Sequence, residues 1–264
     1  MSPAVYFAII LFVKMTVTAG FVLVATIAAE RAGPLVGGLI ATLPIAAGPA
    51  YFFLALDHDA SFIADSARAS LAINPLLAIF AVAYAALAQR YSLWASYGLA
   101  IGLWVMLVYV VQLWQWTLPQ VLLFNLVVLP MCIMAARPMR AATMKRVPTR
   151  WYDVIGRAVS VAVLVVAVVG LSFKIGPRGT GILAVFPIVL SSIIFIMHPR
   201  AGGKVSGAII ANTVVGFLGF GLALTALSVT APMLGSAFAL PAALLVSFAW
   251  GPLVLAVKRR GIPV

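Results

Sequence analysis

Long apolar segments follow one another along almost the whole chain, separated by short polar or charged connections. Most of these segments reach roughly 18 residues or more, the length at which an apolar run becomes a candidate transmembrane helix. The pattern therefore predicts an all-α, polytopic integral membrane protein with about nine transmembrane helices. The expected spans are residues 4–29, 34–56, 64–88, 92–114, 117–136, 152–173, 178–197, 204–229 and 232–257.

The composition agrees with a protein that is solvated by lipid. Hydrophobic residues make up 65 % of the 264 residues and charged residues only 8 %, whereas about a quarter of the residues of a soluble domain are charged. We therefore expect the lipid bilayer as a partner and no separate water-soluble domain. The first apolar segment follows a short start without a basic stretch, so we interpret it as a retained helix rather than a signal peptide.

The distribution of charge predicts the orientation. The net charge of +12 comes mostly from Lys and Arg at the ends of apolar segments. This placement is typical of membrane proteins that follow the positive-inside rule, and it does not favour nucleic-acid binding. The basic linker 137–151 is expected in the cytoplasm, which places the N-terminus outside and the C-terminus inside a bacterial-type cytoplasmic membrane. Lys174 and Arg178 fall on the opposite side from the one that the rule favours.

A twelve-residue pattern occurs twice. Residues 33–44 read GPLVGGLIATLP and residues 176–187 read GPRGTGILAVFP. The copies begin five spans apart, an odd number, so the second is expected upside down relative to the first. We therefore predict two inverted-topology repeats, with five spans in residues 1–136, a linker at 137–151, and four spans in residues 152–264.

Paired spans interrupted by Gly and Pro resemble those of inverted-repeat secondary transporters, in which such breaks form the binding site. This resemblance implies breaks in helices two and seven at Pro44 and Pro187, with Gly38 and Gly181 beside them. A packing kink is the alternative for each proline. If the helices are broken, the free N–H groups of the half-helices suit an anion. Three hydroxyls beside the breaks are further candidate ligands: Thr42, Ser191 and Ser192.

Charged and amide side chains within the apolar spans complete the predicted site. Lys14 lies about ten residues into the first span and is expected to face the bundle interior or an aqueous cavity. Arg157, its counterpart in the second repeat, could bind substrate or reach the membrane surface. Asn74 and Asn212 also correspond in the two repeats, and they either bind substrate or form hydrogen bonds between helices.

The first half of the chain also resembles the small four-span GlpM-like membrane proteins. The likeness rests on Gly38, Leu39, Ile40 and Pro44 in the second span and on Asp65 and Arg68 at the start of the third. It implies a duplicated membrane module and no particular chemistry.

We expect no enzyme activity, cofactor or metal site, because the sequence has no catalytic triad, zinc motif or carboxylate pair inside a span. The excess of cations predicts a carrier of a small anionic or zwitterionic substrate, working by alternating access at the midplane. The alternative is a non-transporting membrane subunit or assembly factor that binds partner helices. A channel is less favoured because the spans carry few polar residues. Gly98-x-x-x-Gly102 allows close approach of another helix and is interpreted as packing. A homo-oligomer is a further possible partner.

Overall fold

The computed structural model describes residues 3–31, 46–140 and 150–259. These residues form helices, and no strand is present among them. The helices are α1 (Pro3–Arg31), α3 (Ala47–Asp57), α4 (Ala60–Leu87), α5 (Leu93–Gln112), α6 (Leu118–Ala136), the 3-10 helix η1 (Arg137–Met139), α7 (Trp151–Ala184), α8 (Ile188–Ala201), α9 (Gly203–Thr213), α10 (Gly216–Leu234) and α11 (Ser236–Arg259).

Six helical segments of the described residues are long and apolar enough to cross a membrane. The expected all-α fold is therefore confirmed, together with apolar helices of membrane-spanning length. The count of nine spans and the inverted repeat stay predictions.

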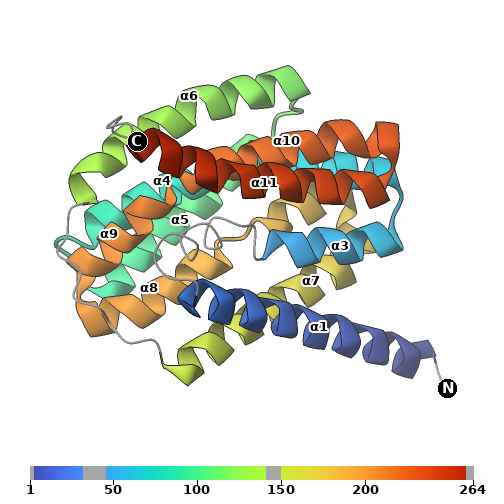
Figure 1. Cartoon of the computed structure of the whole chain (residues 1–264), viewed down its shortest axis with the longest axis horizontal. Coiled ribbons are helices and arrows are strands. Elements are labelled where there is room, and N and C mark those ends of the chain that lie inside the picture. Colours follow the sequence, from blue (N-terminus) through green and yellow to red (C-terminus); the bar gives the residue numbers. More distant parts are fainter. Residues whose placement is uncertain (1–2, 32–45, 141–149, 260–264) are drawn as a thin grey trace.

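Helix α4 forms the centre of the bundle (Figure 1). It packs against α5, α6, α7, α9 and α10. In its most apolar stretch 72 % of the residues are buried, compared with 17 % in that of α11. Small residues allow this close packing, because an added Cβ on Gly181 of α7 would lie 2.1 Å from the Ser66 carbonyl oxygen of α4. An N-cap fixes the start of α4, where the Asp59 carboxylate accepts a hydrogen bond from Phe62 N at 2.8 Å.

The outer helices expose apolar side chains, as expected for helices that face lipid. Phe12 of α1, Trp94 of α5, Leu126 of α6 and Leu245 of α11 are each more than half exposed. The bundle thus has apolar residues on both its inside and its outside.

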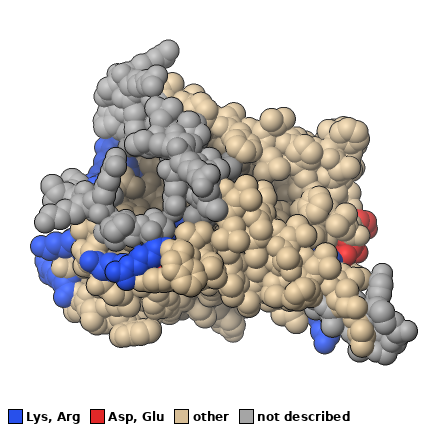
Figure 2. All heavy atoms as spheres, turned by 60° about the horizontal axis from the view of Figure 1, so that its bottom comes forward, with Lys and Arg blue, Asp and Glu red and all other residues tan. Residues whose placement is uncertain are grey.

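The connections between helices gather at two opposite ends of the bundle (Figure 1). The connections α4–α5 and α8–α9 lie at one end, and the connections α3–α4, α5–α6 and α10–α11 lie at the other. Figure 2 shows Lys and Arg gathered at the first end and acidic residues at the second. We name these the basic end and the acidic end.

The helix boundaries differ from the expected spans in the second half. The predicted span 204–229 is divided into α9 and α10 at Val214 and Val215, and the indole N–H of Trp250 donates to Val215 O at 3.3 Å. The predicted span 178–197 is also divided, because α7 ends at Ala184 and α8 begins at Ile188. Both divisions leave backbone groups to be satisfied by packing partners.

Candidate functional site

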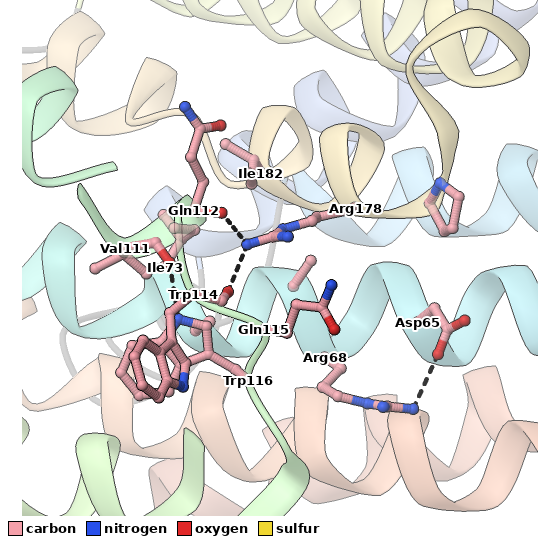
Figure 3. Close-up of a pocket in the computed structure, with 13 residues that line it drawn as sticks. Asp65, Arg68, Ile73, Val111, Gln112, Trp114, Gln115, Trp116, Arg178 and Ile182 are labelled. Atoms are coloured by element: carbon pink, nitrogen blue, oxygen red, sulfur yellow. Dashed lines mark hydrogen bonds and ion pairs between the residues drawn. The ribbon is translucent and has the colours of Figure 1, made fainter. Parts of the chain in front are cut away.

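A cavity of about 350 Å³ lies next to the α5–α6 connection, at the acidic end of the bundle, and Figure 3 shows the residues that line it. Its walls come from three parts of the chain: the first half of α4, the end of α5 with the α5–α6 connection, and the C-terminal segment of α7. The lining residues are Asp65, Arg68, Ala69, Ala72, Ile73, Val111, Gln112, Trp114, Gln115, Trp116, Pro177, Arg178 and Ile182.

Two guanidinium groups enter this cavity from different helices. Arg68 of α4 donates to the Asp65 carboxylate at 2.9 Å, and Arg178 of α7 reaches the cavity from the other side of Gln115 (Figure 3). The Arg68 Nε is buried and has no hydrogen-bond partner among the described residues. Two arginines and one aspartate give the lining a formal charge of +1, which favours an anion.

A turn at Gly176 places Arg178 on the cavity wall. Gly176 has φ 67° and ψ −179°, a conformation that is essentially restricted to glycine. Pro177 then begins a second helical segment, a position where its missing N–H costs nothing. The chain therefore reverses, and this segment packs on α4 with Arg178 in its first turn.

Arg178 is held in place by the end of α5. Its Nη2 donates to Gln112 O and, at 2.6 Å, to Trp114 O, carbonyls that a helix C-terminus leaves without helical partners. Because these two hydrogen bonds hold Nη2, they also fix the orientation of the other nitrogens of the Arg178 guanidinium. Arg178 is both a cap for α5 and a charged part of the wall.

The inner part of the cavity is apolar. Ala72 and Ile73 of α4 are buried, and Val111 and Ile182 complete the apolar surface. Trp116 is fixed beside them, because its indole N–H donates to Val111 O at 2.8 Å. The charged side chains Asp65, Arg68 and Arg178 are more exposed, so the cavity has a charged entrance and an apolar floor.

Among the described residues, none of the predicted binding residues lines this cavity. Asn74 comes nearest, since it directly follows Ile73, but its amide is turned to other helices. The Asn74 amide donates to Asn125 Oδ1 at 3.0 Å and to Phe217 O at 2.9 Å. Of the two roles predicted for Asn74, the structure thus shows the hydrogen bond between helices.

Asn74 and Asn212, which correspond in the predicted repeats, do not bond to each other. Asn212 is exposed, and its amide donates to Ala208 O of its own helix at 2.8 Å. The sequence register paired the two residues, but Asn212 lies on the exposed face of α9. The partner of Asn74 is instead Asn125 of α6.

Lys14 is 8 % exposed, and a carboxylate accounts for its burial. Lys14 Nζ lies 2.5 Å from Asp57 Oδ2 at the end of α3 and 5.8 Å from the centre of the Phe53 ring. Buried charges need such partners. The structure thus places Lys14 in an ion pair between α1 and α3.

The structure describes only some of the residues around the predicted helix breaks. Gly38, Thr42 and Pro44 lie outside the described residues. Pro187 stands at the N-cap of α8, three residues after the last residue of α7. Gly181 is not at a break: it lies inside the second segment of α7, where it lets that segment approach α4.

The hydroxyls of Ser191 and Ser192 are used within the fold. Ser191 Oγ donates to Pro187 O at 2.7 Å and lies 3.1 Å from the Tyr97 hydroxyl, and Ser192 Oγ donates to Val189 O at 2.7 Å. Arg157 is half-buried in the first half of α7. These side chains are therefore separate from the cavity.

One feature of the sequence pointed to this cavity without identifying it. Arg178 stands on the side where the positive-inside rule disfavours a cation. Binding of a substrate by this cation would explain why it stands there. Trp114, Gln115 and Trp116 form a turn that combines aromatic and polar groups, and no sequence pattern predicts that this turn and Arg68 line one cavity. Only the packing of α7 on α4 brings these elements together.

No family model, curated protein or solved structure matches this chain. The resemblances to inverted-repeat transporters and to GlpM-like proteins therefore stay predictions.

The cluster of Lys14 and Asp57 includes a histidine whose titration can be measured. His58 Nε2 lies 2.7 Å from Ser172 Oγ, and its ring stacks on Phe62 with the ring centres 3.7 Å apart. Burial lowers the pKa of His58 most, and Lys14 lowers it further, against the opposing effect of Asp57 and Asp59. The folded state therefore disfavours protonated His58.

We expect His58→Gln to make stability less sensitive to acid. Because the pKa is lower in the folded state, the parent retains full stability above the ordinary histidine pKa of about 6.5 and loses stability as the pH falls below it. Melting temperatures of both proteins between pH 7.5 and pH 5 test this. As pH falls, the melting temperature of the variant should rise relative to that of the parent. A difference in melting temperature that stays constant with pH would contradict this prediction.

Proposed function

We propose that this chain is a membrane carrier of small anionic or zwitterionic substrates, and that the cavity between α4, α5 and α7 is its binding site. The observation that carries the proposal is the pair of arginines from two different helices in a cavity that opens toward one end. Ligand sites in membrane proteins commonly combine buried or partly buried charge with access to water.

Contacts at the basic end support a state that is open on one side only. Arg200 of α8 makes a bidentate ion pair with Asp153 of α7, at 2.5 and 2.6 Å. The Tyr84 hydroxyl of α4 lies 2.8 Å from both His198 Nδ1 and Ser206 Oγ. These contacts join α4, α7, α8 and α9 at the end opposite to the cavity mouth, as alternating access requires of one of its states.

The repeated Gly-Pro pattern gives the proposal a route for movement. In the second copy, a turn at Gly176 and a second interruption at 185–187 separate the α7 segment that carries Arg178 from the rest of α7 and from α8. In inverted-repeat carriers such interrupted helices lie at the binding site. We propose that the two copies act in the same way here and that one repeat rocks against the other.

The alternative, a membrane subunit or assembly factor that binds partner helices, has one observation in its favour. Gly98 and Gly102 lie on the exposed face of α5, and an added Cβ on either would meet nothing within 4 Å. Such a face allows close approach of another helix. It is compatible with a homo-oligomer of a carrier as well, so transport is the measurement that separates the two functions.

Transport by proteoliposomes is expected to depend on Arg178. Loss of one charge-assisted hydrogen bond costs about 1.5–3 kcal/mol, so Arg178→Gln should lower the uptake of a labelled anion at least tenfold. Lys174→Gln is the matched control, since Lys174 is exposed, belongs to the same helix and does not line the cavity.

The assay compares uptake of labelled acetate, benzoate, phosphate and amino acids into liposomes with and without the protein. Equal losses in the Arg178 and Lys174 variants would show a general surface-charge effect and contradict the assigned site. No uptake of any compound would favour the partner-binding alternative.

A further inference from the structure

The cavity contains two chemically different regions at a fixed separation along α4. Asp65 and Arg68 stand at its entrance, and Ile73 stands on its floor, between one and two turns beyond Arg68 on the same helix. A rise of about 1.5 Å per residue separates Arg68 from Ile73 by about 7–8 Å. A ligand that contacts both regions must therefore have a polar group at one end and an apolar part that reaches across this separation.

Charge selects the polar group. Arg68 is paired with Asp65 only through an exposed contact, with the two side chains 41 % and 54 % exposed, and such pairs contribute little. A ligand carboxylate can therefore bind Arg68 with little loss. Asp65 accepts from Nη2 of Arg68 alone, and a guanidinium binds a carboxylate through two parallel hydrogen bonds.

The single aspartate limits the charge of the ligand. Asp65 brings the formal charge of the lining to +1, so one negative charge is balanced and a second one is not. The one aspartate of the lining stands beside Arg68, and this neighbouring positive charge disfavours the ammonium group of a zwitterion there. The lining thus favours a monoanion over a dianion or an amino acid.

The floor selects the apolar part. Ile73, Val111 and Ile182 form the apolar surface, and the indole of Trp116 is held against Val111 O and stacked with Phe124 at 5.2 Å between ring centres. A volume of about 350 Å³ is at the small end of ligand pockets, about 300–1,000 Å³. The space suits a single ring or a short branched chain.

We propose that the ligand of this cavity is a small amphipathic monocarboxylate, with its carboxylate on Arg68 and its apolar body against Ile73, Val111 and Ile182. The inference rests on the proposed function for its role in transport. The binding site itself can be tested without transport, by measuring ligand binding to the purified protein.

Benzoate is the probe, because it joins one carboxylate to one ring. Calorimetric titration of the detergent-purified protein should show benzoate binding at least tenfold tighter than acetate, which lacks the ring, and at least tenfold tighter than benzyl alcohol, which lacks the charge. Arg68→Gln should weaken benzoate binding at least tenfold. Arg90→Gln, which removes an exposed arginine beyond the other end of α4, should leave it unchanged.

Three results would overturn the proposal: equal affinity for acetate, phosphate and benzoate; tighter binding of phenylalanine or benzylamine than of benzoate; or equal effects of the Arg68 and Arg90 variants when both melt at the parent temperature. Benzoate binding without uptake into proteoliposomes would support the ligand class and overturn the carrier. Uptake of another anion without benzoate binding would overturn the ligand class and leave the carrier in place.

Discussion

Gly181→Ala is expected to lower the free energy of unfolding by about 3 kcal/mol, the upper part of the usual range for an overpacked core. The added Cβ would lie 2.1 Å from the carbonyl oxygen of Ser66 and 2.8 Å from the Cβ of Ala69. A backbone carbonyl cannot rotate away as a flexible side chain can. The second segment of α7 must therefore move away from α4.

This movement would also disrupt a chain of buried hydrogen bonds. Ser70 Oγ donates to Gly181 O at 2.6 Å and lies 2.7 Å from the Tyr51 hydroxyl, so one serine connects α3, α4 and α7. Arg178 belongs to the same segment, three residues earlier. Ligand binding in the cavity should therefore weaken together with stability.

Gly156→Ala is the matched control, because it changes the same residue type in the same helix. An added Cβ on Gly156 would meet nothing within 4 Å, and alanine is favoured over glycine in a helix interior by about 0.5–1 kcal/mol. We expect its melting temperature to equal or exceed that of the parent in the same detergent. A melting temperature of Gly181→Ala equal to that of the parent would contradict the close packing of α7 on α4.

The helices and their apolar outer faces could be predicted from the sequence, because they depend on local apolar length and composition. The predicted span 92–114 corresponds closely to α5, and the predicted span 117–136 to α6. The two regions of opposite charge also follow from the order of charged connections along the chain. These features need no knowledge of which helix packs against which.

The candidate site could not be predicted, because each of its parts has an ordinary explanation when read alone. Arg68 is three residues from an aspartate, and Arg178 follows a turn. Their common cavity depends on the reversal at Gly176 and on the packing of α7 against α4. Repeat register was a poor guide to contacts for the same reason: it paired Asn74 with Asn212, whereas the structure pairs Asn74 with Asn125.

Asn125 was missed although its signal is as clear as that of Asn74, an amide inside an apolar span. Its role follows from Pro75, which has no N–H and so cannot donate to the carbonyl of Leu71 four residues earlier. Asn125 Nδ2 donates to Leu71 O at 2.8 Å and to Val121 O at 2.9 Å. A side chain of α6 thus replaces the backbone donor that α4 lacks, as membrane helices with proline require.

Asn125→Leu is therefore expected to lower the free energy of unfolding by about 1–3 kcal/mol. The change leaves the buried Leu71 carbonyl without its donor and removes one acceptor of the Asn74 amide, at about 0.6–1.7 kcal/mol for each hydrogen bond between membrane helices. Asn212→Leu is the control: Asn212 is exposed and bonded within its own helix, so its loss should cost less than about 0.5 kcal/mol.

A second substitution tests the cause of this loss. Pro75→Ala restores the N–H that Leu71 O needs, so the double variant Asn125→Leu/Pro75→Ala should recover at least half of the stability that Asn125→Leu loses. In a double-mutant cycle measured by reversible unfolding in one detergent, the coupling energy between positions 75 and 125 should reach about 1 kcal/mol. Additive effects would mean that Asn125 stabilises the bundle through Asn74 and Val121 alone, and that the carbonyl freed by Pro75 is satisfied in another way.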